Sequence, residues 1–395
     1  MNNSIEKKQR ILMVHNFYQI GGGEHTVFES EQKLLKEHGH DIIIYTRDNT
    51  ELNRWKLKRI FLPFTTVFSL KSYRDIKRII KSMKPDVVHC HNTFPLVSPS
   101  AYYAAIHCRV PVIQTIHNYR FLCPEGMFFC DGHVCELCRE NRTFRGALRN
   151  KCYRGSRLQT MIVAAMLKLH RFLGTYRKID YIFLTEFNRS KFDRLIDIQG
   201  ANVFVKPNFV NAEMPERHRM ENKVFVFAGR LEENKGIHLL LDRWRLLPED
   251  CELHIYGDGT LKEKVAKAAA EQGNVSFFGF RPQADVFEDL KSAVGLIFPS
   301  LWYEGFPMVV AESMAMGCPV LATNLGNHGD IVRQSQGGVL FEPDSEESFM
   351  DAVNQMISEN ERLSENAGSY YETVLNKDSN YKALEEIYRA VAAGT

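Results

Sequence analysis

Short apolar runs alternate with longer amphipathic segments along most of the chain. Five such runs, rich in Val, Ile, Leu and Phe, lie in the first half, and six lie in the second. In chain order they are RILMVHNF, DIIIYTR, DVVHCHN, PVIQTIHN and YIFLTEF, then VFVFAGR, CELHIYGDG, VSFFGF, VGLIFPS, PVLATN and GGVLFEP. Continuous apolar strands separated by helical segments indicate parallel sheets that are covered by helices on both faces.

The restart of this pattern in the second half predicts two Rossmann-like α/β domains. Pro, Asn and charged residues accumulate over residues 206–223, where we expect the connection between them. We place the N-terminal domain at residues 1–209, with a cysteine-rich insert at about 120–155, and the second domain at 210–375. Residues 376–395 should form a helix that packs back toward the N-terminal domain.

Composition supports a folded, unexported protein. The apolar fraction of 44% and the charged fraction of 25% are typical of globular domains, and a net charge of +2 argues against nucleic acid as a general partner. The N-terminus lacks the apolar run of a signal peptide, so we expect a cytoplasmic location. Nine cysteines in such a chain favour thiols or metal ligands over disulfides.

The stretch GGGE follows the first strand and should open a helix. Glycines there let backbone N–H groups approach a phosphate or sugar, which makes Gly22 and Gly23 candidate ligand contacts; a tight turn without a ligand is the alternative. The stretch is not a dinucleotide fingerprint, because Thr26 stands at the third glycine position and Arg47 precedes the acid Asp48.

Two cations flank a strand-to-helix loop in the second half. Arg230 ends the run VFVFAG, and Lys235 follows five residues later, next to Gly236. Such a pair suits a diphosphate, since each charge-assisted hydrogen bond contributes about 1.5–3 kcal/mol. Solvated surface charge is the alternative reading of the pair alone.

Two carboxylates surround a strongly apolar turn, YEGFPMVVAESMAMG. Glu304 lies in the loop after a strand, Pro307 should begin a helix that ends at Gly317, and Glu312 falls on its second turn. An anionic group can then sit on the helix N-terminus, while a carboxylate on each side accepts hydrogen bonds from hydroxyls. A nucleotide sugar has both parts. The N–H groups expected at this N-terminus are those of Gly305, Phe306 and Met308.

The stretches GGGE, TIHNYR, FAGRLEENKG, YGDG and EGFPMVVAE, in this order, resemble the retaining, nucleotide-sugar-dependent glycosyltransferases of family four. The resemblance covers nearly the whole chain. It implies the GT-B fold, in which two Rossmann-like domains face each other across a cleft, and transfer of a sugar with retained anomeric configuration.

The resemblance also implies roles for individual residues. Arg230 and Lys235 would hold the donor diphosphate, Glu312 would bind the ribose, and Glu304 would contact the transferred sugar. His117, at the end of PVIQTIH, would face the sugar near the reacting carbon and, with Glu304, belong to the catalytic centre. Further donor contacts implied are Gly22, Gly23, Gly257, Phe280, Arg281, Gly305, Phe306, Met308 and Val309, of which Phe280 and Arg281 would meet the nucleobase.

One position departs from the family pattern. Many relatives carry Asp after this histidine, whereas this chain has Asn118. The way in which His117 is polarised is therefore left open.

The cysteine-rich insert predicts a structural zinc site. Cys135 and Cys138 have knuckle spacing, and Cys123 and Cys152 flank them as in a four-thiolate site. The alternative is a set of reduced structural thiols, and His133 or Cys130 could also serve as a ligand. We expect no cofactor for catalysis, because no Asp-x-Asp occurs and the two cations with the helix N-terminus would replace a metal ion.

Residues 141–179 contain ten Lys or Arg and no acid, interleaved with the apolar stretch LQTMIVAAMLKLHRFLG. Residues 54–84 add a second basic, apolar-rich segment. Such a surface suits anionic lipid headgroups. A solvated helix face with a groove for an acidic acceptor is the alternative, and no recognised module points to an oligonucleotide.

The sequence thus predicts a glycosyltransferase, peripheral on the cytoplasmic face of a membrane, that acts on a glycan or lipid-linked acceptor in surface polysaccharide synthesis. Two alternatives remain: another GT-B enzyme, such as a sugar-nucleotide epimerase, or a non-catalytic sugar-nucleotide-binding or scaffold protein.

Overall fold

The computed structural model describes residues 8–19, 22–51, 58–193, 201–215 and 223–393, which form two compact units. Unit 1 comprises the described residues up to Gly126, Glu136–Lys206 and those from Tyr381 onward. Unit 2 comprises Met127–Cys135 and Pro207–Asn380. From the sequence we expected the division at 209/210 and the C-terminal helix to begin at 376.

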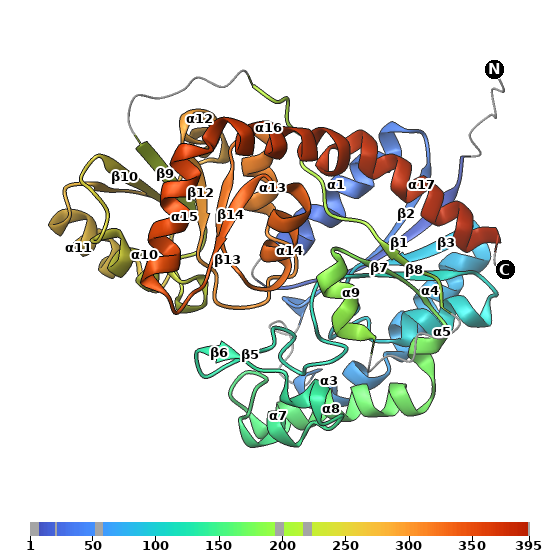
Figure 1. The fold of residues 1–395 in the computed structure, drawn as a ribbon. Coiled ribbons are helices and arrows are strands. Elements are labelled where there is room, and N and C mark those ends of the chain that lie inside the picture. The colour runs from blue at the N-terminus through green and yellow to red at the C-terminus, as the bar shows by residue number, and fades with distance from the viewer. Residues whose placement is uncertain (1–7, 20–21, 52–57, 194–200, 216–222, 394–395) are drawn as a thin grey trace, which may run out of the picture. The chain divides into compact units, whose positions relative to one another are not determined.

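Unit 1 is built on a six-stranded parallel sheet in the order β2-β1-β3-β4-β7-β8 (Figure 1). Its central strands are buried on both faces, as their unbroken apolar runs predict: Ile11, Leu12, Met13 and Val14 of β1 have no exposed surface. The strands are β1 (Arg10–Phe17), β2 (Asp41–Asp48), β3 (Val87–Cys90), β4 (Val112–Ile116), β7 (Asp180–Phe183) and β8 (Val203–Val205).

Helices flank this sheet on both faces, and α17 at the C-terminal end of the chain is one of them (Figure 1). The helices of unit 1 are α1 (Gly23–Glu37), α3 (Lys58–Val67), α4 (Leu70–Met83), α5 (Ser100–His107), α6 (Leu137–Glu140), α7 (Arg145–Arg149), α8 (Arg157–Phe172), η1 (Thr175–Arg177), α9 (Glu186–Phe192) and α17 (Lys377–Ala393). From Tyr381 onward α17 belongs to unit 1, where the Tyr388 hydroxyl lies 2.7 Å from Nδ1 of His89.

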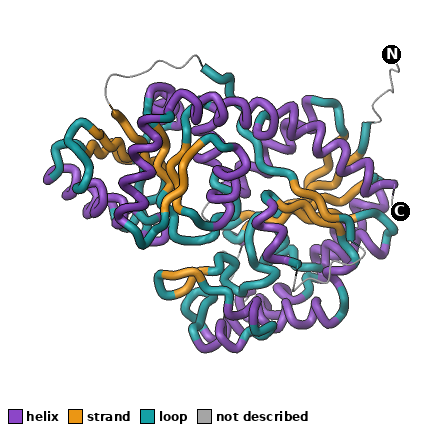
Figure 2. The backbone as a smooth tube through the Cα atoms, viewed as in Figure 1, coloured by secondary structure: helices purple, strands orange, loops and turns teal. Residues whose placement is uncertain are grey.

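Unit 2 repeats the architecture with a second six-stranded parallel sheet, in the order β11-β10-β9-β12-β13-β14. Figure 2 draws the strands of both sheets in orange, with helices in purple beside them. Its strands are β9 (Lys223–Ala228), β10 (Cys251–Tyr256), β11 (Val275–Gly279), β12 (Gly295–Phe298), β13 (Val320–Thr323) and β14 (Gly338–Phe341). Its helices are η2 (Glu233–Lys235), α10 (Ile237–Trp244), α11 (Lys262–Glu271), α12 (Gln283–Ser292), α13 (Met308–Ala315), α14 (Gly326–Ser335), α15 (Glu346–Ser358), α16 (Asn360–Tyr370) and η3 (Tyr371–Leu375).

The prediction of an α/β fold with two parallel sheets is confirmed, and each of the eleven predicted apolar runs contains a strand. Three strands were not predicted: β8, and the hairpin of β5 (Phe129–Cys130) and β6 (His133–Val134) in the cysteine-rich insert. These strands are only two or three residues long, too short to show a hydrophobic period.

The strand orders place a topological switch point between β1 and β3 in the first sheet and between β9 and β12 in the second. In open parallel sheets, ligands bind outside the carboxyl ends of the strands at such points. The segments that follow these four strands therefore define where each unit can form a site.

Gly236 closes the loop after β9. It has a φ of 69°, and a Cβ added there would lie 1.9 Å from the carbonyl oxygen of Pro299, in the segment after β12. Only glycine permits both the left-handed backbone and this close approach of the two loops.

We therefore expect Gly236→Ala to lower the free energy of unfolding of unit 2 by more than about 2 kcal/mol, since the left-handed conformation alone costs 1–2 kcal/mol. Gly273→Ala is the matched control, because its added Cβ would meet no atom within 4 Å, and it should change stability by less than about 0.5 kcal/mol. Denaturant unfolding of both variants measures the difference, and equal stabilities would contradict the close approach.

Candidate functional site

A part-buried ion pair marks the switch point of unit 2. Lys235 follows β9 and Glu304 follows β12, and the Lys235 Nζ lies 2.7 Å from Oε1 of Glu304. The Ser300 hydroxyl donates to the same oxygen at 2.7 Å. The two donors hold this carboxylate in one position, and only 6% of Glu304 is exposed.

The loop between β12 and α13 is held from a third strand end. Asn327, which follows β13, donates from Nδ2 to the carbonyl oxygens of Glu304 and Gly305, the latter at 2.7 Å. This loop leads to the N-terminus of α13, where Pro307 is the N-cap and no side chain caps the helix. The uncapped N-terminus beside a fixed carboxylate is the arrangement that the sequence predicted for an anion with neighbouring hydroxyls.

Glu312 lies on the second turn of α13, half-buried. The Gln283 Nε2 donates to its Oε1 at 2.6 Å. Burial raises the pKa of Glu312 above its usual value, and the Gln283 hydrogen bond opposes that rise. Glu312 is thus an oriented acceptor for which a ligand hydroxyl can replace Gln283.

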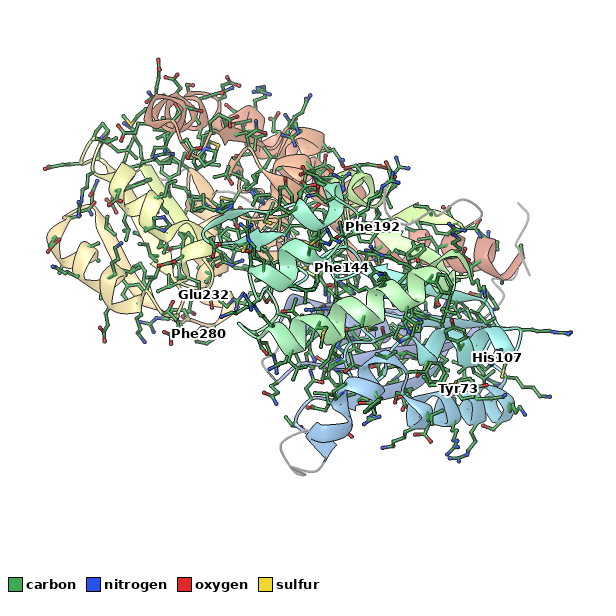
Figure 3. The ribbon with its side chains drawn as sticks, turned by 90° about the horizontal axis from the view of Figure 1, so that it is seen from below. Tyr73, His107, Phe144, Phe192, Glu232 and Phe280 are labelled. Carbon is green, nitrogen blue, oxygen red and sulfur yellow. The ribbon has the colours of Figure 1, made fainter. Side chains whose placement is uncertain are left out.

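The remaining predicted donor contacts lie at the surface or in the backbone. Arg230 has a 61% exposed side chain and pairs with Glu232 at 3.3 Å, and Phe280 is 78% exposed (Figure 3). The side chains of Phe306, Met308 and Val309 pack against the core of unit 2, which leaves their backbone N–H groups for a ligand.

Among the other predicted glycines, Gly257 lies against a neighbouring loop, since an added Cβ would meet the Gly229 carbonyl oxygen at 1.9 Å. Gly22 is the N-cap of α1, and the first residue of that helix is Gly23. Gly22, Gly23 and His117 belong to unit 1, and the other predicted donor contacts belong to unit 2.

Three strand ends of unit 1 meet at Glu24, in the first turn of α1. Asn92, after β3, donates to its Oε1 at 2.9 Å, and Asn118, after β4, donates to its Oε2 at 3.4 Å. Burial raises the pKa of Glu24 to about 7, although Arg120 and the two amides favour the charged form. Glu24 ends the stretch GGGE, and the sequence did not predict it as a site residue.

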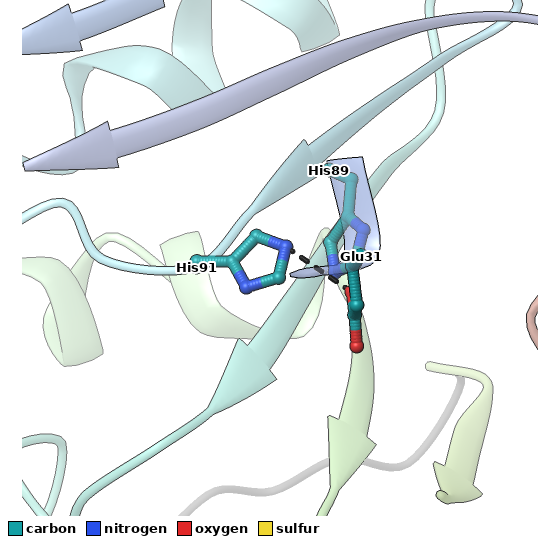
Figure 4. Close-up of side chains that lie close together, drawn as sticks. All are labelled: Glu31, His89 and His91. Carbon is teal, nitrogen blue, oxygen red and sulfur yellow. Dashed lines mark ion pairs between the residues drawn. The ribbon is translucent and has the colours of Figure 1, made fainter. Parts of the chain in front are cut away.

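Beneath Glu24 lies a fully buried cluster. Glu31, one helical repeat further along α1, accepts from the Lys206 Nζ at 2.8 Å, and Nε2 of His91 lies 3.4 Å from its second oxygen (Figure 4). His91 contacts His117 through a second nitrogen, with 3.1 Å between Nδ1 and Nε2. The predicted residue His117 is therefore attached to a cluster that the sequence analysis missed.

The sequence contained a pattern that could have identified Glu31 and the two histidines of β3 and its end. Glu31 occupies a core position of α1, among Val27, Phe28, Leu34 and Leu35, where a charge requires a partner. The run VVHCHN places two histidines on one strand end. Lys206 carried no signal, because β8 was not predicted.

Glu31, His89 and His91 could in principle bind a metal ion together. Among the described residues they form the one group of His, Cys, Asp or Glu side chains whose ligand atoms all lie within 4.8 Å of one another. Both ring nitrogens of His89 are already 2.7 Å from hydroxyls, of Tyr388 and Thr115, and Lys206 neutralises Glu31. Because His89 is occupied by two hydroxyls and Glu31 is paired with a cation, we assign no metal to this cluster, in which Glu31 Oε2 and His91 Nε2 have no hydrogen-bond partner among the described residues.

The predicted zinc ligands fall in both units: Cys123, Cys138 and Cys152 in unit 1 and Cys135 in unit 2. Cys123 and Cys138 are buried, and Cys135 and Cys152 are half-buried. The zinc site stays a prediction.

Two family models match adjacent parts of the chain. The model described as Glycosyltransferase Family 4 matches residues 20–213, and Glycosyl transferases group 1 matches residues 211–372. The chain belongs to the family-4-type glycosyltransferases. The two matched segments carry the Glu24 and Lys235–Glu304 arrangements, respectively.

Curated relatives are distant. An uncharacterized glycosyltransferase of Methanocaldococcus jannaschii is 24% identical over 340 residues, which cover 81% of this chain and 79% of that protein. The lipopolysaccharide 1,6-galactosyltransferase of Salmonella typhimurium is 29% identical over 174 residues, 42% of this chain and 48% of that protein.

Solved structures share the fold at low identity. A Rickettsia africae glycosyltransferase matches with a TM-score of 0.68 and 18% identity over 98% of this chain and 100% of that one. Anabaena HepE in complex with UDP matches with a TM-score of 0.63 and 16% identity over 96% and 99%. The glycosyltransferase has the GT-B fold.

The buried histidines predict a pH dependence of stability. Burial lowers the pKa of His15 to about 3 and of His89 to about 4, and places the pKa of His91 well below its usual value. The pKa of each histidine is 6.5 in the unfolded chain and lower in the folded protein. As pH falls through 6.5, the unfolded chain therefore binds more protons than the folded protein, and the free energy of unfolding decreases.

We expect the free energy of unfolding of unit 1 to fall between about pH 7.5 and pH 5.5, by about 1.4 kcal/mol for each buried histidine, while Glu24 opposes part of the fall because its raised pKa lets the folded state bind a proton in this range. Denaturant titrations at both pH values measure the change. A flat profile would show that these imidazoles are charged in the folded state.

Proposed function

We propose that this glycosyltransferase is a retaining enzyme that transfers a hexose from a nucleoside-diphosphate sugar to a glycan or lipid-linked acceptor at the cytoplasmic face of a membrane. The observation that carries the proposal is the Lys235–Glu304 pair at the switch point of unit 2, beside the uncapped N-terminus of α13. A cation, a fixed carboxylate and free N–H groups are what a phosphorylated sugar requires.

The donor would bind by exchanging the contacts described for unit 2. Its diphosphate would accept hydrogen bonds from Lys235, Arg230 and the N–H groups of α13, and its ribose would replace Gln283 on Glu312. Glu304, freed from part of its pairing, would accept from hydroxyls of the sugar. The UDP complex of HepE, which shares the fold, supports a nucleotide in this role.

Transfer requires stabilisation of a departing diphosphate and of an oxocarbenium-like sugar. Lys235 and the α13 N-terminus supply positive potential to the first, and Glu304 supplies negative potential to the second. Retention would follow from attack on the same face of the sugar as the leaving phosphate, with that phosphate assisting removal of the acceptor proton. We expect no metal requirement at this site.

The acceptor would bind unit 1. Glu24 is a carboxylate oriented by two amides at the switch point, suited to accept a hydrogen bond from an acceptor hydroxyl. A groove of about 410 Å³ in the same unit has apolar walls from α3 and α8 and polar residues, Gln19 and Asn49, in its lining. An apolar wall beside polar groups fits a lipid-linked acceptor. The Salmonella relative, named for lipopolysaccharide, supports this acceptor class.

Helix α8 supports attachment to a membrane surface. Leu158, Met161, Leu169 and Phe172 recur at helical spacing and are 62%, 50%, 42% and 87% exposed. Arg149 and Arg157 line a surface depression together with Leu158 and Met161, so cations and apolar side chains are interleaved. In the part of the chain that the structure describes, no helix has the length and hydropathy to cross a bilayer. An anionic lipid surface is the partner that this mixture fits.

Lys235→Ala should weaken donor use by about ten- to a hundredfold, as expected for loss of one charge-assisted contact. Arg230→Ala should act in the same range, because its 3.3 Å pair with Glu232 is exposed and a phosphate can replace it. Initial rates of nucleotide release across a nucleotide-sugar panel measure kcat/KM, with EDTA present throughout.

Lys262→Ala is the control, since this exposed lysine pairs with Asp258 at 3.5 Å within unit 2 and should leave the rates unchanged. Wild-type kinetics in both donor variants would refute the diphosphate site. Activity that requires added magnesium or manganese would refute the metal-free mechanism.

Neutralising four exposed cations of unit 1 should abolish sedimentation with anionic vesicles, because each basic residue near the surface contributes about 1 kcal/mol. Arg171 is not among them: its guanidinium donates to the Phe121 carbonyl oxygen and lies 4.9 Å from the Phe144 ring, so it supports the fold. The variant changes Arg142, Arg149, Arg157 and Lys168 to Gln.

A charge-matched control variant neutralises four exposed cations of unit 2 and should sediment like the wild type. It changes Arg245, Lys262, Lys264 and Lys267 to Gln. If the unit 1 variant still sediments with vesicles at physiological salt, this surface does not contact the membrane. If both variants lose vesicle binding, the binding depends on the net charge of the protein and not on this surface.

A further inference from the structure

The contact between His91 and His117 lies nearly in the plane of both rings. The ring planes differ by 20° and the ring centroids are 5.3 Å apart, while Nδ1 of His91 and Nε2 of His117 are 3.1 Å apart. The rings therefore meet edge to edge through these two nitrogens, in the geometry of an N–H···N hydrogen bond. One nitrogen must carry the proton and the other must accept it.

Glu31 decides which nitrogen donates. Burial alone would raise the pKa of Glu31, but the charge and hydrogen bond of Lys206, with 2.8 Å between Nζ and Oε1, lower it below the usual value. The carboxylate is therefore ionised and accepts only. Its second oxygen, Oε2, lies 3.4 Å from Nε2 of His91, and among the residues that the structure describes neither atom has a hydrogen-bond partner.

The proton positions follow from this acceptor. Burial keeps both imidazoles neutral, since it places the pKa of His91 well below its usual value and lowers that of His117 to about 3. The single N–H of His91 belongs on Nε2, because a lone pair facing a carboxylate would be repelled. Nδ1 of His91 then accepts from Nε2–H of His117, whose own Nδ1 remains unprotonated.

We propose that Glu31 and His91 are positioning residues that hold His117 in its Nε2–H tautomer, so that its Nδ1 accepts a hydrogen bond from a substrate hydroxyl. The inference rests on the proposed function, because His117 is placed near the transferred sugar by the family resemblance. It makes His117 a neutral hydrogen-bond acceptor throughout the working pH range.

This series of contacts from Glu31 through His91 to His117 also accounts for Asn118. In relatives an Asp at this position could orient the histidine, whereas Asn118 here donates to Glu24 at 3.4 Å. An Asp there would place two carboxylates side by side. The carboxylate that orients His117 in this chain is Glu31, acting through His91 from the interior of unit 1.

The other ionisable groups around the chain do not compete for these protons. His89 has both nitrogens occupied by hydroxyls, and the ring of His15 stacks on Phe28, with centroids 4.7 Å apart. Burial lowers the pKa of both and keeps them neutral. Tyr388 is buried, and burial raises its pKa well above the usual value, so its hydroxyl stays protonated.

The tautomer can be measured directly on the full-length protein. With ¹⁵N-labelled histidine, the wild type should show a protonated Nε2 and an unprotonated Nδ1 for His117 between about pH 6 and pH 8. The His117→Asn variant assigns the signal. A protonated Nδ1, or a doubly protonated ring at neutral pH, would overturn the proposal.

Glu31→Gln should exchange the donor and acceptor roles of His91 and His117. Lys206 would keep the amide oxygen of the new side chain, so its NH₂ would face His91 and donate to Nε2. His91 would then carry its proton on Nδ1 and donate to His117, whose proton would move to its own Nδ1. Retention of the Nε2–H tautomer in this variant would overturn the proposal.

His91→Asn is the second variant, and it carries the test if the first does not fold. Its shorter side chain cannot reach Glu31, so the His117 signal should shift to the average of two tautomers. His170→Asn is the control for loss of a buried histidine, since His170 contacts Thr175 and the Val67 carbonyl oxygen. It should leave the His117 signal unchanged.

Kinetics separate positioning from a structural role. With the nucleotide sugar that the panel selects, Glu31→Gln and His91→Asn should each lower kcat by about ten- to a hundredfold, the range for partners that orient a functional histidine, with little change in donor KM. His170→Asn should keep wild-type kcat. Reversed tautomers with wild-type kcat would overturn the positioning role. If no nucleotide sugar is used by the wild type, the proposed function fails, while the tautomer measurement still decides the proton arrangement.

Discussion

The buried ion pair between Lys206 and Glu31 is the interaction on which the carboxyl edge of unit 1 depends. Both side chains are almost entirely excluded from water, which costs several kcal/mol per ion unless each is paired and hydrogen-bonded. The pair joins the last strand of the sheet to the first helix and fixes the charge of Glu31. That charge orients His91, which in turn contacts His117, so a single cation sets the proton positions of a whole polar cluster.

Unit 2 also has a Lys–Glu ion pair, but its side chains are more exposed. Lys235 and Glu304 are also paired, at 2.7 Å, but their side chains are 16% and 8% exposed, whereas the pair of unit 1 is 1% and 0% exposed. A charge pair that can be reached by a ligand can exchange partners, and one that is sealed cannot. The sealed pair therefore suits orientation, and the more accessible pair is the one for which we propose donor binding.

The sequence predicted the fold because long apolar runs report parallel strands, and each run it marked contains one. It predicted Lys235 and Glu304 because each follows a strand, Glu312 because it falls on the second turn of the helix that begins after Pro307, and His117 through the family resemblance. It did not predict the residues that hold them. Ser300, Asn327 and Gln283 act through contacts between segments far apart in the chain, and Lys206 follows a strand of three residues that has no readable period. Short strands and long-range polar contacts leave no local pattern.

The C-terminal helix has a consequence for synthesis of the protein. Residues from Tyr381 onward belong to unit 1, where Tyr388 binds His89 and Tyr381 stacks on His38 at 3.6 Å between ring centroids. Domains usually fold in the order in which they leave the ribosome. Here unit 1 includes residues from Tyr381 onward, which are synthesised after the last residue of unit 2, so unit 2 is the part that can complete its folding first.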